Sequence, residues 1–358
     1  MRLSLAHWLV APRIRVPSLY LWKAVPSVEL QLFDSRISVE SDYYYKKTTN
    51  LLLNKPIPQS TGFSGVLSNV GSLSNQGVDI AVTTRNIEER DFSWTTSFTA
   101  NYNKNKVLSL GSNNTDIFPG PFWGPVSDGF TILRVGQAAG SFWGYKRLGT
   151  YSTDDVAKGL AADPSFPYKA GEEKESADKY ILGHGSPNWN GSFVNTFRYK
   201  EFDLMVDLQY SQGASIAQAF LFSSEDRTGY SNSLVTELNA WTPTHQNTDI
   251  QQLRFAPDAG QSAAFDSHWV ANGSFIRGRN VVLGYNLTQG QLNAIHVKRL
   301  RFYVSAQNLF LIMSKEYKGY DPQSISWNTP GAPPFGQNIE FYQYPKARTF
   351  TFGLNMGL

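Results

Sequence analysis

A strict alternation of apolar and polar residues recurs along the chain and constrains its fold more than any other feature. In the stretch FDLMVDLQY every second residue from Phe202 to Tyr210 is apolar, and Asp203, Asp207 and Gln209 fall between them. Successive side chains of a β-strand point to opposite faces of its sheet, so this pattern predicts strands with one apolar and one polar face. The chain is therefore predicted to be all-β.

Pairs of alternating stretches predict four β-hairpins. Residues 34–36 separate VELQLF from ISVESDYYYKK, and residues 86–90 separate GVDIAVTT from DFSWTTSFTANY. Residues 200–201 separate NGSFVNTFRYK from FDLMVDLQY, and residues 288–296 separate NVVLGYNLT from KRLRFYVSAQNL. Short polar connections between such runs favour antiparallel pairing. With the closing stretch TFTFGLNMGL, the pattern predicts nine strands.

The connections between these strands alternate in length. The short turns interleave with long segments at 48–75, 105–187, 213–272 and 310–346. Outer-membrane barrels have short periplasmic turns and long extracellular loops, so counting back from the C-terminus puts every long segment outside. This parity requires that SFWGYKRLGTY, within 105–187, belongs to a loop and does not span. Because transporter barrels close with about 22 strands, we predict a partial transmembrane antiparallel β-barrel of about nine spanning strands.

Composition supports a membrane location and excludes other classes. Aromatic residues make up 14% of the chain and charged residues 17%, which suits a lipid-facing band with aromatic rims. No run of about 18 apolar residues occurs, so membrane crossing has to rest on strands. The net charge of +3 contains no long single-sign run, which argues against a nucleic-acid partner. An aromatic-rich soluble β-sandwich fits the same composition and stays an alternative.

No catalytic or metal-binding pattern stands out. The chain has no cysteine, and its five histidines show neither the H-E-x-x-H motif nor close pairing, so no zinc site is predicted. The acidic clusters at 154–155 and 172–175 are typical of solvated surface. We therefore predict no catalytic residue, metal or cofactor, and no enzymatic activity.

Aromatic residues in the long segments are the candidates for ligand binding, because flat rings stack on sugars and offer rigid contact area to peptides. They are Trp123, with Phe122 beside it, and Trp143, Tyr145, Trp241, Trp269, Tyr320 and Trp327. Packing within the loops, or a place in an aromatic belt, is the alternative for each of them.

Longer motifs resemble a known family. The run SNVGSLSNQGVDIAVTTRNIEERDFSWTTSFTANYNKNKVLSL looks like the recurring barrel segment of SusC/RagA receptors. Further matches in the family's order are YYYKKTTNLLLNKPIPQSTGF, VGQAAGSFWGYKRLGTY, GSPNWNGSFVNTFRYKEFDL, GSFIRGRNVVLGYNL, RFYVSAQNLF, YKGYDPQ and RTFTFGLNMGL. Together they make residues 28–358 similar to the C-terminal part of a TonB-dependent receptor barrel.

This resemblance implies a place in the bacterial outer membrane and uptake of glycans or oligopeptides. Its implied partners are a SusD-like surface lipoprotein, the lipid bilayer, the outer-membrane assembly machinery and the TonB–ExbB–ExbD system. The TonB contact would run only through an N-terminal plug and TonB box, which are not visible in these residues. The last strand would carry the assembly signal, formed by Phe350, Phe352, Leu354, Met356 and Leu358.

Three departures from the family pattern carry expectations of their own. Residues 1–27 match no part of the family and show no working signal peptide, so we leave them unassigned and predict a non-native or misassigned stretch. The chain ends on Leu358, where many members end on an aromatic residue. The segment AGEEKESADKYILG lacks the alternating Asp and Asn ligands of a calcium loop, so no calcium is predicted there.

The leading hypothesis is a receptor for nutrient transport, in which this chain supplies barrel wall and outer loops. A non-functional truncated remnant of such a receptor is the first alternative. A secreted carbohydrate-binding β-protein is the second.

The chain is expected to aggregate when it is purified without detergent, because strands with lipid-facing residues and open edges self-associate in water. Size-exclusion chromatography with and without detergent measures this. A monodisperse, detergent-free monomer would contradict the membrane hypothesis and favour the secreted β-protein.

Overall fold

The computed structural model describes residues 2–5, 15–16, 19–24, 26–56, 60, 62, 65–111, 113–118, 130–160, 169–225, 232–253, 265–323 and 338–357. Two of the candidate tryptophans, Trp123 and Trp327, and the terminal Leu358 lie outside these residues.

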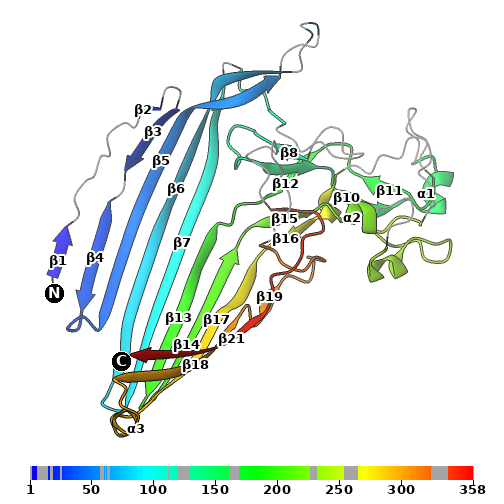
Figure 1. The fold of residues 1–358 in the computed structure, drawn as a ribbon. Helices are drawn as coiled ribbons and strands as arrows, with labels where there is room; N and C mark the ends of the chain where they lie inside the picture. The colour runs from blue at the N-terminus through cyan, green and yellow to red at the C-terminus, as the bar shows by residue number, and fades with distance from the viewer. Residues whose placement is uncertain are drawn as a thin grey trace.

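One large antiparallel sheet dominates the fold (Figure 1). Its main path runs through β1 (Arg2–Leu5), β4 (Ser27–Leu32), β5 (Ile37–Pro56), β6 (Gly65–Glu88), β7 (Phe92–Leu110), β13 (Trp189–Tyr199), β14 (Phe202–Gln212), β17 (Phe275–Asn286), β18 (Arg299–Gln307) and β21 (Thr349–Gly357). Three strands lie off this path: β19 (Leu311–Met313) pairs with β17, β3 (Leu19–Ala24) pairs with β5, and β2 (Arg15–Val16) pairs with β3. The nine predicted strands are β4 to β7, β13, β14, β17, β18 and β21, each paired to the next along the chain. The prediction of an antiparallel all-β fold is confirmed.

Short connections lie at one end of this sheet, which we call the turn end. Residues 33–36 join β4 to β5, and Phe33, Asp34 and Ser35 all have positive φ there. Residues 200–201 join β13 to β14. The connection from β17 to β18 differs from the plain turn expected at 288–296, because it contains the helix α3 (Gln289–Ala294). Thr288 and Gln291 form a capping box that begins this helix, and this T-x-x-Q signal is present in the sequence.

The expected loop at 48–75 is wrong in its bounds. Strand β5 continues to Pro56 and β6 begins at Gly65, with Thr48 opposite Leu73. A register shift follows Thr49, where Asn50 has a φ of 58°. This bulge disrupts the alternation in TTNLLLN, which is why the pattern appeared to stop at a strand that continues.

Residues 1–27 contribute backbone to the sheet, which the sequence did not predict. Strand β1 pairs with β4, and β3 pairs with β5 from Tyr20, opposite Thr49, to Ala24, opposite Tyr45. The prediction about the origin of these residues stays a prediction.

The long connections fold together at the opposite end, which we call the loop end. They form a loop body of described residues between 113 and 188, 213 and 274, and 310 and 348 (Figure 1). Its strands and helices are β8 (Thr131–Ile132), β9 (Ser141–Gly144), β10 (Arg147–Thr150), α1 (Thr153–Ala157), β11 (Glu173–Glu175), β12 (Tyr180–His184), β15 (Ser215–Gln218), α2 (Leu221–Ser224), η2 (Val235–Asn239), η3 (Ser267–Trp269), β16 (Val270–Asn272) and β20 (Ile339–Glu340).

Three small sheets organise the described part of the loop body. Strand β9 lies between β12 and β8, and β15 lies between β16 and β20. Strand β10 pairs with β11 alone, so SFWGYKRLGTY forms loop-body strands and joins no strand of the large sheet, as predicted. In the part of the chain that the structure describes, no helix has the length and apolar character needed to cross a membrane.

The buried aromatic core lies in the loop body rather than beneath the sheet. Phe130, Phe142, Phe265 and Trp269 pack together with Ala217 and Ile339. These residues come from all three long connections, so burial of apolar surface joins segments that are far apart in sequence. The loop body is therefore a compact unit with its own core.

The two faces of the large sheet differ in chemistry, as the alternation predicted. On one face Leu204 lies opposite Leu283, Leu283 opposite Val304, and Val304 opposite Phe352. Leu283 is 51% exposed and Phe352 is 79% exposed, so this apolar row is uncovered within the chain. Such a band is what a barrel presents to lipid.

The opposite face carries ion pairs between β14 and β17 and, across β17, between β14 and β18. Arg301 Nε donates to Asp203 Oδ1 at 3.0 Å, and Asn286 Nδ2 donates to the same oxygen at 2.9 Å. Arg279 Nε donates to Asp207 Oδ2 at 2.7 Å. Cross-strand pairs of opposite charge stabilise a sheet and suit a polar barrel interior.

Aromatic rows border the apolar face at both ends. At the turn end the paired residues run Phe92, Tyr199, Phe202, Tyr285 and Phe302 across five strands. At the loop end the Tyr102 and Trp189 rings lie 4.8 Å apart. Ten residues separate Phe92 from Tyr102 on β7, which at about 3.3 Å per residue and a tilt of about 45° gives a band of about 24 Å. This height matches the lipid-facing band of an outer-membrane barrel.

Replacing Phe193 by Arg should lower the free energy of unfolding in lipid by about 2–4 kcal/mol, because Phe193 lies on the apolar face midway along β13. Thr196→Arg is the matched control, since Thr196 is exposed on the polar face of the same strand. Guanidinium titration of protein folded into vesicles measures both. Equal losses for the two variants would show that the apolar face does not meet lipid.

Candidate functional site

The structure separates the candidate aromatic residues instead of gathering them. Trp269 is 1% exposed and Trp241 is 4% exposed, so both pack in the loop body and the expectation that they bind ligand is wrong. Trp269 lies edge-on to Phe265 with ring centroids 5.7 Å apart. The sequence does not distinguish an exposed loop tryptophan from a buried one here, because the core of the loop body forms only when connections distant in sequence meet.

Three of the described candidates keep accessible surface. Arg134 Cζ lies 4.2 Å from the ring centroid of Trp143, and Lys179 Nζ lies 5.0 Å from that of Tyr145, so cations cover one face of each ring. Tyr320 is 71% exposed. Ligand contact stays a prediction for these three residues.

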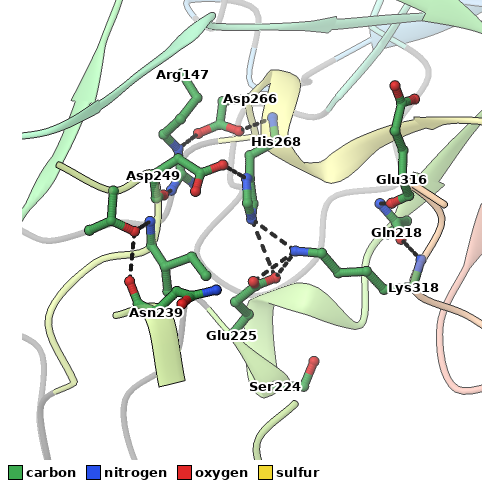
Figure 2. A network of polar contacts seen from close by, with 12 residues as sticks. Arg147, Gln218, Ser224, Glu225, Asn239, Asp249, Asp266, His268, Glu316 and Lys318 are labelled. Carbon is green, nitrogen blue, oxygen red and sulfur yellow. Dashed lines mark hydrogen bonds and ion pairs between the residues drawn. The ribbon is translucent and has the colours of Figure 1, made fainter. Parts of the chain in front are cut away.

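Buried charges join the three connections of the loop body (Figure 2). Arg147 on β10 donates through Nε to the Asp266 carboxylate, and its Nη2 lies 3.2 Å from Glu173 Oε1. Its Nη1 donates to the backbone carbonyl oxygen of Asp249 at 2.8 Å. Glu175 also brings a carboxylate oxygen within 4.8 Å of those of Glu173 and Asp266. The guanidinium group of Arg147 pairs with two of these three carboxylates, those of Glu173 and Asp266, and we describe the cluster as an ion-pair centre.

His268 lies at the middle of the network. Asp266 caps η3 by accepting a hydrogen bond from the backbone N–H of His268 at 2.7 Å, which orients the imidazole. The ring Nδ1 lies 3.0 Å from Asp249 Oδ2. The ring Nε2 lies 3.3 Å from Glu225 Oε2 and 3.4 Å from Lys318 Nζ.

Glu225, the acid that contacts the ring Nε2 of His268, is fully buried, with a side chain that is 0% exposed. Lys318 Nζ donates to both of its carboxylate oxygens at 2.7 Å. Burial acts to raise the pKa of Glu225, but the hydrogen bonds from His268 and Lys318 outweigh it and hold the pKa below its ordinary value. The hydrogen bond from His268 lowers the pKa of Asp249 to about 2.

A second buried cluster fastens the last connection to β17. Arg277 Nη2 donates to Asp321 Oδ1 at 2.6 Å. Tyr317 donates its hydroxyl to Glu340 Oε2 at 2.6 Å, and burial raises the pKa of Glu340. The YKGYDPQ motif therefore supplies structural contacts, and the backbone N–H of Gln323 closes a turn by donating to Asp321 Oδ1 at 3.0 Å.

The network defines how the loops dock on one another. Arg147 and Glu173 come from the first long connection. Glu225, Asp249, Asp266 and His268 come from the second, and Lys318 comes from the third. Removing one partner of a buried ion pair costs about 3–5 kcal/mol, because the other charge stays buried and uncompensated. No local pattern in the sequence marks these residues, since a charge in a polar segment does not show which distant charge it will meet.

Comparisons with known proteins agree with the interpretation of the large sheet as a portion of an outer-membrane barrel. No protein-family model matches the chain. It is 35% identical over 344 residues to TonB-dependent receptor P3 of Formosa agariphila, and 27% identical over 350 residues to TonB-dependent receptor SusC of Bacteroides thetaiotaomicron. These matches cover 92% and 94% of this chain. A structure of the RagAB peptide importer, in a closed-closed state, superposes over 94% of the chain with a TM-score of 0.72 and 24% identity, covering 35% of that chain.

The chain spans about a third of the length of these curated relatives, 33% of one and 31% of the other. The relatives confirm the resemblance to a SusC/RagA-type barrel portion, the partial-barrel fold class and the outer-membrane location that the sequence predicted. They are receptors and a transporter by name, which agrees with the expectation of a non-enzyme.

Asp249→Asn should lower the stability of the loop body at neutral pH and remove part of its acid sensitivity. The pKa of Asp249 falls from 3.8 to about 2, so the carboxylate stabilises the fold above pH 3.8 and this contribution is lost as pH falls toward 2. Asp249 is largely solvent-exposed, so screening limits the effect to about 1 kcal/mol. Hydrogen exchange of residues 248–253 and 266–272 between pH 2 and 5, corrected for intrinsic rates, measures it.

Asp178→Asn is the control, because Asp178 is an exposed acid of the same loop body. If Asp249→Asn and wild type lose protection at the same pH, the contact between Asp249 and His268 does not stabilise the loop body.

Proposed function

We propose that this chain, a barrel portion of a SusC/RagA-type TonB-dependent receptor, forms wall and outer mouth for the uptake of glycans or oligopeptides across the outer membrane. The observation that carries the proposal is the separation of the sheet into an apolar face bordered by aromatic rows and an ion-paired polar face. An apolar face that stays uncovered within the chain, on a sheet whose other face is ion-paired, suits a wall between lipid and an aqueous lumen.

The orientation follows from the two ends of the sheet. In the proposed arrangement the turn end faces the periplasm, and the loop body faces the outside. Asp203, Arg301 and Asp207 then face the transport lumen. The loop body, which has a core of its own, forms part of the rim through which cargo enters.

The proposed partners follow from the relatives. SusC is named a TonB-dependent receptor and RagAB a peptide importer, which supports a peptide or glycan cargo and coupling to TonB–ExbB–ExbD. A SusD-like surface lipoprotein would lie over the loop end. The assembly machinery would engage β21, whose Phe350, Phe352, Leu354 and Met356 are exposed on one face. Coupling to TonB would run through receptor parts other than these strands.

The two alternatives make different predictions about the cell. A secreted carbohydrate-binding β-protein is disfavoured by the continuous exposed row of Leu283, Val304 and Phe352, which water does not solvate well. A non-functional remnant would leave no assembled protein in the outer membrane. Detection of the protein there separates the remnant from the receptor.

Deletion of the gene in its source organism should abolish uptake of at least one class of fluorescently labelled oligosaccharide or oligopeptide, and the wild-type gene should restore it. An antibody to the chain should find the protein in the outer-membrane fraction. Complementation with the Phe193→Arg variant is the matched control, because assembly of this variant should fail. Absence of the protein from that fraction, or unchanged uptake of both classes, would overturn the proposal.

A further inference from the structure

The ring Nε2 of His268 lies between two partners that require opposite protonation states (Figure 2). Glu225 Oε2 lies 3.3 Å away and Lys318 Nζ lies 3.4 Å away. A protonated Nε2 donates to the carboxylate, whereas a deprotonated Nε2 accepts from the ammonium group. Asp249 Oδ2, 3.0 Å from Nδ1, keeps a proton on that nitrogen in both states. One proton on Nε2 therefore decides which partner His268 bonds.

The charges around the ring favour the doubly protonated state. Among the described residues, those that face it are Glu225 beside α2, Asp249, Asp266 before η3, and Lys318. Arg147 and Glu173 lie behind Asp266, and Glu316 is bonded to the backbone of Asn272. Arg147 balances Asp266, so Glu225 and Asp249 outnumber Lys318 until the ring carries its second proton. The His268 side chain is 8% exposed, so solvent screens these charges weakly.

We propose that His268 is a proton-operated clasp that holds the loops of the mouth together. When doubly protonated, it bridges Glu225 and Asp249, which lie in separate parts of the second connection, and Glu225 holds Lys318 of the third. Loss of the Nε2 proton removes the bond to Glu225 and leaves Lys318 as the partner of that nitrogen. The direct bond between Glu225 beside α2 and His268 of η3 is then lost, and the two side chains are linked through Lys318.

The packing around the clasp indicates what this release would loosen. Phe222 of α2 lies 6.2 Å from Trp269 of η3, ring centroid to ring centroid, beside the bond between Glu225 and His268. Breaking that bond removes the polar half of the contact between the two helices. We expect α2 and η3 to gain local motion while the large sheet stays unchanged, because the sheet does not use this contact.

The sign of the pH dependence follows from the favoured state. A bond that needs the protonated ring stabilises the loop body fully below the ordinary histidine value of about 6.5 and is lost as pH rises above the value in the fold. At the acid end Asp249 stays ionised down to about pH 2. The clasp is thus closed on the acid side of the His268 transition and opens on its alkaline side. Any role of the clasp in uptake rests on the proposed function, whereas the pH-dependent contact itself does not depend on that function.

Hydrogen exchange of the full chain in detergent, followed from about pH 5.5 to 9.5, tests the clasp. With intrinsic rates removed, protection of residues 220–225 and 266–272 should fall about tenfold on the alkaline side, and that of β13 and β14 should not change. His268→Gln should remove this pH dependence. His184→Gln is the matched control and should keep it, because His184 Nδ1 contacts only the backbone oxygen of Ser186, at 2.7 Å.

Two milder variants separate a proton-operated clasp from a merely structural contact. Lys318→Gln removes a positive charge beside the ring and should move the midpoint of the transition to higher pH. Asp249→Asn removes a negative charge and should move the midpoint to lower pH. These opposite shifts decide the question even if His268→Gln fails to fold. A midpoint that moves in neither variant, or in the same direction in both, would overturn the clasp, and neither result depends on whether the protein imports cargo.

Discussion

The requirement that every backbone N–H and C=O be paired inside a bilayer governs this molecule. Within hydrocarbon a sheet satisfies it only by pairing each strand on both sides, which is why β4 to β7, β13, β14, β17, β18 and β21 run antiparallel in chain order, with registers that bulges shift locally. Once the backbone is paired, the side chains point to the two faces of the sheet, of which one meets lipid and the other meets water. Phe193 and Leu283 meet one solvent, and Asp203 and Arg301 meet the other. The aromatic rows at Phe92 and Tyr102 lie where these environments change.

The loop body obeys a different constraint, because it lies beyond the sheet and must build its own interior. Phe142, Phe265 and Trp269 supply a core that no single connection contains. Short strands such as β15, between β16 and the parallel β20, pair backbone that would otherwise be buried without partners. Apolar burial therefore holds the loop body together, whereas the sheet leaves its largest apolar surface open to lipid.

Charge serves separate purposes in the two parts. On the sheet, Arg279 with Asp207 links the neighbouring strands β17 and β14, and Arg301 with Asp203 links β18 and β14 across β17, both at the polar face. In the loop body, Arg147, Glu225, His268 and Lys318 link segments distant in sequence and lie nearly out of reach of solvent. Buried ion pairs add little net stability, but they penalise any docking that leaves a charge unpaired. This network gives the rim of the proposed receptor a defined arrangement.

The sequence by itself determined the strands, their pairing order and the chemistry of each face, because alternation is a local property and the period of two is fixed by the backbone. It also carried the family resemblance. Only the tertiary structure decided the loops: it continued β5 past the bulge at Asn50, placed Trp241 and Trp269 in a core, and brought Lys318 to Glu225 across 93 residues. Such contacts depend on how separate connections meet in space, and a single charge or ring leaves no periodic trace of its distant partner.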